Sequence, residues 1–325
     1  MSDFRKSLTI VMPVFDDWEA FRELVRRIEA TVHQDMLNIS ILAVNDGSVS
    51  ELDGRGDIFH GIKNIHSVDI LHLTRNLGHQ RAIAIGLAYA EQNLRQDTVI
   101  VMDADGEDRP EDIHVLVAKG MECRDKIIFA RRTKRSEGVG FRYFYQMYKM
   151  IYRVLTGSSI SFGNFCLIPS ELLKKLVFVS EIWNHFSAGV IKSRLPFVTI
   201  PTVRGKRIGG SSRMNFNSLI GHGLSAVAVH METVAVRLLL TALGLILLSL
   251  VGIGVVFGIR FLTDLAIPGW ATNVSIGLVI IFMQAFFISL FLVFLILTYR
   301  TQKLFVPRVD YVHYVLRKEQ IFQRS

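Results

Sequence analysis

Two long uncharged stretches near the C-terminal end constrain this chain more than any other feature. The run Leu238–Ile259 holds 22 residues without a charged side chain, between Arg237 and Arg260. A second run spans Val274–Tyr299 and ends at Arg300. A helix rises about 1.5 Å per residue, so about 20 apolar residues cross the ~30 Å hydrocarbon core of a bilayer. The two runs therefore predict a pair of transmembrane helices rather than core helices of a soluble protein.

The charges that flank the two runs indicate an orientation. The linker Phe261–Asn273 carries Asp264 and no basic residue, whereas basic residues precede the first run and follow the second. Cytoplasmic flanks are enriched in Lys and Arg, so both ends of this hairpin are expected in the cytoplasm. The N-terminal stretch MSDFRKSLTIVMPVF has no apolar segment of signal-peptide length. We therefore expect an integral protein of the cytoplasmic (inner) membrane, with both termini in the cytoplasm.

The net charge of +8 narrows the class of partner. An anionic membrane surface, a phosphorylated substrate or a nucleic acid would each suit a basic chain. Nucleic acid is not expected, because the chain lacks basic residues interleaved with aromatic ones on a soluble face. Cys123 and Cys166 have no CxxC partner or histidine cluster beside them, so neither a disulfide framework nor a zinc site is predicted.

Residues 1–215 have the pattern of a mixed α/β domain. Apolar runs expected as strands alternate with helix-period segments expected as helices; the strands are Leu8–Pro13, Ile39–Asn45, Ile70–Leu73 and Thr98–Asp103, and the helices are Trp18–Thr31 and Gly78–Gln92. This alternation predicts βαβ units in a largely parallel sheet.

The rest of the chain divides around the apolar runs. Residues 216–236 are apolar but interrupted, which fits either an amphipathic helix in the membrane interface or the last helix of the α/β domain. Residues 237–300 hold the two membrane helices, about 238–259 and 274–299. Residues 301–325 are expected as a cytoplasmic tail.

Acidic and turn residues follow three of the predicted strands. They are Asp16 and Asp17 after the first, Asn45, Asp46, Gly47 and Ser48 at the end of the second, and Asp103, Asp105 and Glu107 at the end of the fourth. Ligands bind beyond the carboxyl ends of parallel strands. Carboxylates gathered there repel one another, which predicts a shared cation such as a divalent metal that bridges a pyrophosphate. The chain has no GxGxxG after the first strand and no GxxxxGK[ST], so neither dinucleotide binding nor P-loop phosphate binding is supported.

Four sequence elements in this order resemble glycosyltransferase family 2. They are IVMPVFDD, VNDGS, TRNLGHQRAIAIGLAYA and VMDADGEDRPEDI. With the hairpin that follows, the chain looks like the polyprenyl-phosphate subgroup, which includes dolichol-phosphate mannose synthases and bactoprenol glucosyltransferases. The resemblance covers nearly the whole chain. It implies an α/β fold, with a GT-A, Rossmann-like nucleotide-sugar domain followed by a two-helix transmembrane hairpin.

The resemblance also assigns donor contacts to the first two strand ends. It implies that Pro13, Val14 and Asp17 line the nucleotide base and the ribose, and that Asp46 contacts the base. The chain departs from the family pattern here, with Asn45-Asp46 for the usual Asp-Asp and Phe15-Asp16-Asp17 for the usual Tyr-Asn-Glu. Asp17 is one carbon shorter than the glutamate usual at this position.

At the fourth strand end the resemblance implies the reaction centre. Asp103 and Ala104 would lie near the ribose and pyrophosphate, and Asp105 would bind Mg²⁺ or Mn²⁺. Glu107 stands where relatives often have Gln, and its extra negative charge would favour the metal. Asp103 and Asp105, together with Arg131, are the residues to which we assign catalysis.

Two basic stretches offer phosphate contacts. Arg131 and Arg135 resemble the family's arginines, and a guanidinium can hold a phosphate bidentately; a solvated basic loop is the alternative. Arg207 and Arg213 lie in a Gly/Ser-rich stretch where relatives have a loop that closes over the pyrophosphate. Contact with anionic lipid headgroups is the alternative for this stretch. The ten histidines, His79, His185 and His222 among them, form no ligand cluster in the sequence and are read as surface or core residues.

The resemblance implies one displacement with inversion at the anomeric carbon. The donor would be a UDP- or GDP-sugar, and the acceptor a polyprenyl phosphate, undecaprenyl or dolichyl. A lipid phosphate is already anionic near neutral pH, so it needs little help from a general base. A homo-oligomer fits the resemblance, and pathway logic calls for a flippase that moves the lipid-linked sugar.

Two other functions compete with this one. A processive polysaccharide synthase of the same superfamily would carry a Gln-x-x-Arg-Trp motif and more spans, and the sequence has neither. A non-catalytic membrane scaffold with a degenerate nucleotide-sugar domain would have lost its acidic motif, whereas Asp103 and Asp105 are intact.

Overall fold

The structure, a computed structural model, describes residues 6–32, 37–52, 61–132, 139–209, 216–264 and 269–324. It divides into two compact units, which are described separately. One comprises residues 1–147, 159–229 and 304–325, and the other residues 148–158 and 230–303. The first unit is therefore discontinuous in sequence, because the chain returns to it after the two long helices.

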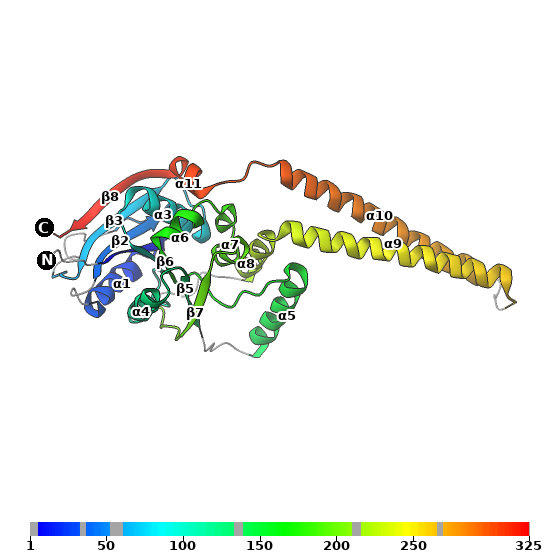
Figure 1. Cartoon of the computed structure of the whole chain (residues 1–325), viewed down its shortest axis with the longest axis horizontal. Coiled ribbons are helices and arrows are strands. Elements are labelled where there is room, and N and C mark those ends of the chain that lie inside the picture. Colours follow the sequence, from blue (N-terminus) through cyan, green and yellow to red (C-terminus); the bar gives the residue numbers. More distant parts are fainter. Residues whose placement is uncertain are drawn as a thin grey trace. The chain divides into compact units, whose positions relative to one another are not determined.

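The first unit is built on an eight-stranded sheet with the order β7-β5-β6-β4-β1-β2-β3-β8 (Figure 1). The strands are β1 (Lys6–Val14), β2 (Leu37–Asn45), β3 (Ile65–Leu73), β4 (Thr98–Val101), β5 (Ile127–Arg132), β6 (Cys166–Pro169), β7 (Phe197–Thr202) and β8 (Val315–Gln323). Strands β4, β1, β2 and β3 are parallel. β6 is antiparallel to β4 and β5, and β8 is antiparallel to β3.

Helices cover both faces of this sheet because side chains alternate along each strand. Leu8, Ile10 and Met12 of β1 pack in one apolar core with α1 (Trp18–Thr31) and α4 (Asp112–Glu122). Val11 belongs to the opposite core, with α3 (His79–Asn93), α6 (Ser170–Leu176) and α7 (Phe186–Ser193). α3 lies so close to the sheet that a Cβ on Gly86 would stand 2.6 Å from Cγ1 of Val11.

Five further elements complete the described parts of the chain outside α9 and α10. They are α5 (Val139–Thr156), the 3₁₀ helix η1 (Ser180–Trp183), α8 (Phe216–Ala228), α11 (Pro307–Asp310) and the 3₁₀ helix η2 (Tyr311–His313).

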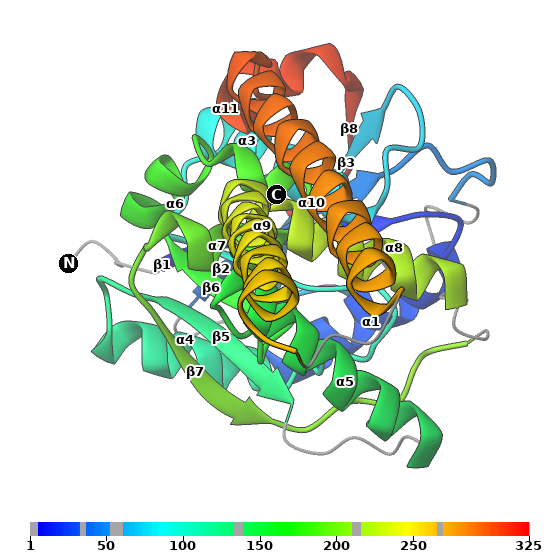
Figure 2. The same ribbon diagram turned by 90° about the vertical axis from the view of Figure 1, so that its right-hand side faces the viewer.

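The second unit is dominated by α9 (Met231–Leu262) and α10 (Trp270–Thr301), which lie side by side (Figure 2). The four buried residues of α9 recur every seven positions: Ala235, Ala242, Ser249 and Val256. Ala285, Ser289 and Leu292 are buried on α10. Mostly small residues at heptad-like spacing let two helices approach closely without a soluble core.

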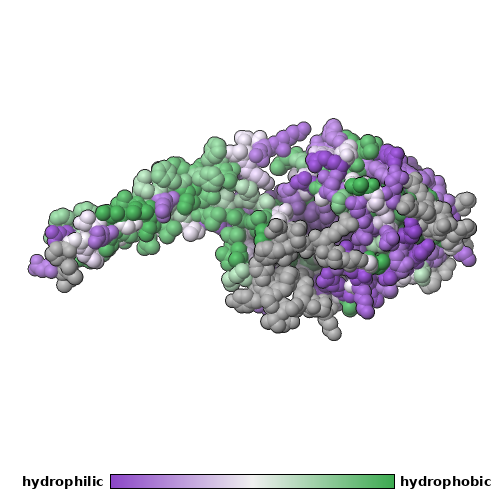
Figure 3. Space-filling model, turned by 180° about the vertical axis from the view of Figure 1, so that it is seen from behind, coloured by the Kyte–Doolittle hydropathy of each residue, from purple (hydrophilic) through white to green (hydrophobic). Residues whose placement is uncertain are grey.

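Both long helices leave most of their apolar surface uncovered (Figure 3). Each has 32 residues, and only 17% of its most apolar window is buried. The core helix of a soluble protein would bury this surface, so the exposed helices fit a lipid environment instead. They are long and apolar enough to cross a membrane.

The predicted α/β fold is confirmed, and α1 has the predicted bounds. The structure adds features that the sequence pattern did not indicate. β3 begins at Ile65, five residues before the expected start, and β8 forms from a stretch expected only as a tail. Within residues 216–236, α8 ends at Ala228 and α9 begins at Met231.

Candidate active site

The acidic turn, residues 103–108, follows β4 in the middle of the sheet. Gly106 has φ +80°, which allows the chain to reverse here. The turn binds its own backbone: Oδ1 of Asp105 accepts a hydrogen bond from the Glu107 amide at 2.9 Å, and Oδ2 of Asp108 accepts one from the Asp103 amide at 3.0 Å. The side chains of this turn are therefore held in defined positions.

Three arginines from two separate elements pair with the acidic turn. Arg132, the last residue of β5, reaches Oε2 of Glu107 at 3.2 Å and Oδ1 of Asp108 at 3.1 Å. Arg204 contacts both carboxylate oxygens of Glu107, at 2.6 and 3.0 Å. The sequence predicted a divalent metal as the partner of these carboxylates and assigned neither Arg132 nor Arg204 to them.

Arg207, in contrast, was predicted as a phosphate ligand. Its Nη1 lies 2.9 Å from Oδ2 of Asp105, and its Nη2 lies 3.3 Å from Oδ2 of Asp17. The guanidinium therefore bridges the carboxylates that follow β1 and β4. This contact brings three of the predicted site residues together.

The segment 204–208, which we call the strap, is also bound to the acidic turn through its backbone. The Gly205 amide donates to the carbonyl oxygen of Glu107 at 2.8 Å, and the Ile208 amide donates to that of Asp105 at 2.8 Å. Ile208 packs over Gly106, where an added Cβ would stand 2.5 Å from Cγ1 of Ile208. The strap thus covers the turn.

Burial and the arginines shift the pKa values of the turn in different directions. Burial raises the pKa of Asp108 to about 7, helped by the charge on Asp103 and opposed by Arg132. Burial, with the neighbouring Asp103, also raises the pKa of Asp105. Burial acts on Asp103 too, but the charges of His79, Arg132 and Arg207 outweigh it and lower its pKa. Asp103 is therefore the most firmly ionised of the three.

The end of β1 supplies the residues predicted to line the donor base. Pro13 and Val14 are buried, and the carbonyl oxygen of Val14 accepts a hydrogen bond from the Asp46 amide at 2.9 Å. Asp17 is the N-cap residue of α1, yet its side chain makes no cap hydrogen bond and pairs with Arg207 instead. Asp16, with φ +47°, accepts hydrogen bonds from the amides of Val49 and Ser50.

Asp46 is occupied by the backbone of its own domain. The side chain is 3% exposed, and its two oxygens accept the amides of Leu77 at 2.7 Å and Gly78 at 2.9 Å. Gly78 is the N-cap of α3, so a carboxylate at this position also lies favourably toward the helix dipole. Burial nevertheless raises the pKa of Asp46, although the two amide hydrogen bonds oppose that shift. The geometry indicates that Asp46 shapes the loop before α3.

His79, the first residue of α3, faces the acidic turn. Its Nε2 lies 3.1 Å from Oδ1 of Asp103 and 3.1 Å from Nδ2 of Asn164. Desolvation would lower the pKa of His79, but the carboxylates of Asp103, Asp105 and Asp108 raise it above the ordinary value. Sequence reasoning missed this contact, because a lone histidine after Leu-Gly gives no signal of what it faces.

A polar chain of residues leads from His79 to α7. Gln80 accepts the amide of Phe186 at 2.6 Å, and its Nε2 lies 3.4 Å from Oδ1 of Asn164. A backbone N–H can only donate, so Oε1 of Gln80 is the accepting atom and its Nε2 is the group that donates to Oδ1 of Asn164. Two further histidines lie near this chain, His185 and His222, with ring centroids 4.5 Å apart. Burial lowers the pKa of His185 to about 3 and also lowers that of His222, so both are neutral.

The other predicted arginines are placed differently. Arg131 is exposed, and since neighbouring strand residues point to opposite faces, it does not share the orientation of Arg132. Arg131 forms no ion pair with any residue that the structure describes. Arg135 and Arg213 lie outside the described residues.

The acidic turn fits a divalent metal by its chemistry. Hard cations such as Mg²⁺ prefer carboxylate oxygens, which Asp103 and Asp105 supply. Oδ1 of Asp103 is buried; it pairs with Nε2 of His79 at 3.1 Å and has no other hydrogen-bond partner among the described residues. Both oxygens of Glu107 are paired with arginines. No group of three His, Cys, Asp or Glu side chains in the described parts of the chain is arranged to hold a metal, so such an ion would take further ligands from a bound diphosphate.

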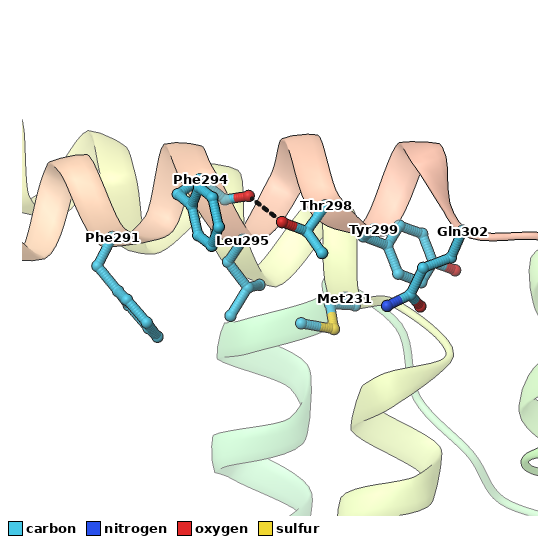
Figure 4. A pocket seen from close by; sticks show the side chains of 7 residues that line it. All are labelled: Met231, Phe291, Phe294, Leu295, Thr298, Tyr299 and Gln302. Atoms are coloured by element: carbon cyan, nitrogen blue, oxygen red, sulfur yellow. Dashed lines mark hydrogen bonds between the residues drawn. The ribbon is translucent and has the colours of Figure 1, made fainter.

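A separate pocket of about 300 Å³ lies in the helical unit (Figure 4). Its lining residues are Met231, Phe291, Phe294, Leu295, Thr298, Tyr299 and Gln302. Thr298 donates its hydroxyl to the carbonyl oxygen of Phe294, which leaves the pocket wall mostly apolar. Because its wall is mostly apolar, the pocket suits a hydrocarbon group rather than a nucleotide. None of the predicted site residues lines it.

This chain is similar to known proteins in both sequence and fold. The family model described as "Glycosyl transferase family 2" matches residues 9–177. The uncharacterized glycosyltransferase YkcC of Bacillus subtilis (strain 168) is 29% identical over 281 residues, which cover 83% of this chain and 82% of that protein. An undecaprenyl-phosphate 4-deoxy-4-formamido-L-arabinose transferase of Erwinia tasmaniensis is 31% identical over 133 residues, 41% of this chain and 39% of the relative.

A second protein of that name, from Klebsiella pneumoniae, is 25% identical over 226 residues, 66% of this chain and 64% of the relative. Among solved structures, glucosyl-3-phosphoglycerate synthase from Mycobacterium tuberculosis has a TM-score of 0.50 and 14% identity. The match covers 70% of this chain and 80% of that one. At this identity, the likeness concerns the fold alone.

Proposed function

The chain belongs to glycosyl transferase family 2 and is a glycosyltransferase, and from that premise we propose that it transfers a sugar from a nucleoside diphosphate sugar to a polyprenyl phosphate. The transfer would take place at the cytoplasmic face of a membrane, with inversion at the anomeric carbon. Two relatives named undecaprenyl-phosphate 4-deoxy-4-formamido-L-arabinose transferase support this acceptor class.

The observation that carries the proposal is the exposed pair of apolar helices in the same chain as the family 2 domain. A transferase with a soluble acceptor needs no such hairpin, whereas a lipid phosphate stays at the bilayer surface. The apolar pocket of about 300 Å³ between α9 and α10 would suit part of an isoprenoid chain. The basic residues that flank the hairpin suit an anionic headgroup at the cytoplasmic surface.

The donor would lie beyond the carboxyl ends of β1 and β4. Pro13, Val14 and Asp17 would border the base and the ribose. The buried Oδ1 of Asp103, which pairs with His79 and has no other partner among the described residues, would also accept a hydrogen bond from a ribose hydroxyl or approach the metal. Asp46 would act indirectly, by holding the loop before α3.

Asp105, with Asp103 beside it, would hold a Mg²⁺ or Mn²⁺ ion, and Ala104 between them would lie near the pyrophosphate. Such an ion would neutralise the charge that develops on the leaving diphosphate. Arg207 would hold the diphosphate. Arg204 would balance the negative charge of Glu107 near the diphosphate. Glu107 would act mainly through its charge, because arginines occupy both of its oxygens.

The acceptor phosphate is anionic at neutral pH, so the protein's task is to position it rather than to deprotonate it. Arg131 is an exposed guanidinium at the end of β5 and would be one ligand for this phosphate. Arg135 and Arg213 remain proposals from the sequence for the same task.

A transfer assay tests the proposal. Full-length protein in detergent would be incubated with Mg²⁺, undecaprenyl phosphate and each member of a panel of radiolabelled UDP- and GDP-sugars. Label is expected in the organic phase with one donor and is expected to disappear with Asp105→Asn. Asp125→Asn, in the exposed loop before β5, removes one carboxylate elsewhere and should leave the transfer unchanged.

Two results would contradict the proposal. Label that enters long water-soluble chains would indicate a processive synthase. The other is donor hydrolysis or sugar transfer that is the same with and without the lipid phosphate for every donor of the panel. This result would indicate another acceptor.

A further inference from the structure

Arg207 makes two contacts that a divalent cation would also make. Its guanidinium lies between Asp17 and Asp105, at 3.3 and 2.9 Å from one oxygen of each. The side chain is 24% exposed, so these ion pairs are only partly screened by water. The carboxylate that the resemblance assigns to the metal is therefore the one that Arg207 holds.

We propose that the Arg207 guanidinium stands in for the divalent cation on Asp105, and that it moves to the donor diphosphate when metal and nucleotide bind together. The inference rests on the proposed function only for the ligand, a nucleoside diphosphate with a divalent metal. It does not depend on the acceptor.

The rest of the strap has its own attachments and does not need to move with Arg207. Arg204 holds Glu107 through two contacts, and the amides of Gly205 and Ile208 donate to the backbone of the acidic turn. Ile208 packs against Gly106. A rotation of the Arg207 side chain therefore suffices, with the strap backbone in place.

Electrostatics makes the two occupants of Asp105 exclude each other. A guanidinium and a dication on one carboxylate lie within a few ångströms and repel each other strongly in a partly buried site. A diphosphate removes the conflict, because it offers Arg207 a new anionic partner and supplies further oxygen ligands to the metal. When metal binds alone, Arg207 loses its contact with Asp105 and gains no new anionic partner. When metal binds with the nucleotide, the diphosphate becomes that partner.

This exchange predicts positive cooperativity between metal and nucleotide. Each would increase the affinity for the other, since the coupling between two ligands is reciprocal. In the absence of nucleotide, Arg207 would keep the metal affinity low.

The test measures binding rather than turnover, on the full-length protein in detergent. Free Mn²⁺ would be followed by its electron paramagnetic resonance signal, without nucleotide and then with saturating UDP or GDP. In the unmodified chain, one of the two nucleotides is expected to tighten Mn²⁺ binding about tenfold, within the usual range of coupling between two sites.

Arg207→Gln should change the two affinities in opposite directions. Mn²⁺ alone is expected to bind about tenfold more tightly, and the nucleotide in saturating Mn²⁺ about tenfold more weakly. A residue that only supports the fold would weaken both, and one that only binds the diphosphate would leave the affinity for Mn²⁺ alone unchanged. Lys206→Gln is the matched control, because it removes the same charge from the neighbouring exposed position and should alter neither affinity.

Several results would overturn the inference. One is an affinity of the unmodified chain for Mn²⁺ that neither UDP nor GDP changes. This result does not depend on whether a variant folds. Another is an affinity of Arg207→Gln for Mn²⁺ alone that equals or falls below that of the unmodified chain. A third is an equal gain in Lys206→Gln. A failure to glycosylate lipid phosphate would leave all these binding results intact, so the two proposals fail separately.

Discussion

Nε2 of His79 lies 3.1 Å from Oδ1 of Asp103, so the first residue of α3 faces the first carboxylate of the acidic turn. His79 begins helix α3, whereas Asp103 belongs to the turn after β4, so the contact joins two separate elements. The positive charge of a protonated His79 would keep Asp103 ionised and oriented toward the donor.

Replacing His79 by alanine is expected to lower kcat/KM for the donor about tenfold, because a hydrogen bond or ion pair to a charged group contributes about 1.5 kcal/mol or more. The fold should persist, since the side chain is 43% exposed. Steady-state kinetics with varied donor would measure the effect. His114→Ala is the control, because that histidine contacts the carbonyl oxygen of Thr31 away from the site. Equal activity of His79→Ala and the unmodified protein would contradict a role for this contact.

Asp46→Asn should reduce stability more than it reduces nucleotide affinity. An asparagine has one oxygen, so it can accept only one of the two amides, of Leu77 and Gly78, that the carboxylate now accepts. The buried site would then hold an unsatisfied group, at a cost of about 2 kcal/mol. Thermal unfolding in detergent and nucleotide titration would be compared. Normal stability with lost nucleotide binding would favour direct base contact, as the resemblance implied.

Gly106→Ala is expected to lower both stability and transferase activity. The backbone has φ +80°, and the new Cβ would stand 2.5 Å from a side-chain carbon of Ile208. A left-handed residue of this kind costs about 1–3 kcal/mol, and the crowding would push the strap off the acidic turn. Ile208→Ala in the same chain should recover the part of the loss that comes from crowding. Gly163→Ala is the control, because nothing lies within 4 Å of its added Cβ.

The pair between Lys318 of β8 and Asp69 of β3 predicts a pH-dependent effect on stability. Nζ of Lys318 lies 3.1 Å from Oδ1 of Asp69, whose side chain is 8% exposed. Burial raises the pKa of Asp69 above its ordinary value, and Lys318 opposes that shift. Lys318→Met would raise the pKa further and leave a buried carboxylate unpaired, so the folded state should lose about 1–2 kcal/mol near neutral pH.

The sign of the pH effect follows from the direction of the shift. A carboxyl with a higher pKa in the folded chain favours folding below its unfolded pKa, and this advantage is lost as pH rises through the folded pKa. The loss in Lys318→Met should therefore be larger at about pH 8 than at about pH 5. Thermal midpoints of the variant and the unmodified protein at the two pH values would show it. Lys318→Met paired with Asp69→Asn should remove the pH dependence, and a loss that is equal at both pH values would refute the account.

Local patterns explain how much of the fold could be predicted from the sequence. Trp18–Thr31 was predicted with the observed bounds, because Phe21, Leu24, Val25 and Ile28 repeat at helical spacing and face the core. The strand before the acidic turn was also predicted, since its apolar run ends in acidic residues. In each case the signal lies within one continuous segment.

β8 had no such signal. Its residues Val315–Gln323 include Arg317, Lys318 and Glu319, and most of the strand is half-exposed or exposed. The strand forms because β3 offers an edge and because Asp69 and His72 of β3 pair with Lys318 and Glu319 of β8. Both conditions depend on residues about 250 positions earlier, which no local pattern records.

The sequence predicted the carboxylates of the candidate site better than the arginines and the histidine that contact them. The acidic turn after β4 follows from the carboxyl-end rule for parallel strands. Which arginine of the pair Arg131 and Arg132 faces that turn depends on the register of β5, and a shift of one residue exchanges them. The contact of His79 depends on how the start of α3 meets the turn after β4, which is defined only once the sheet is assembled.

The product of a reaction in lipid vesicles tests the central claim most directly. The protein would be reconstituted with undecaprenyl phosphate, Mg²⁺ and the donor that the panel identifies, and both products would be analysed by mass spectrometry. Transfer of the sugar alone predicts an undecaprenyl phosphate that gains one sugar and no phosphorus, with a nucleoside diphosphate released in equal amount. A lipid diphosphate with release of a nucleoside monophosphate, or no lipid product beside a glycosylated soluble acceptor, would contradict it.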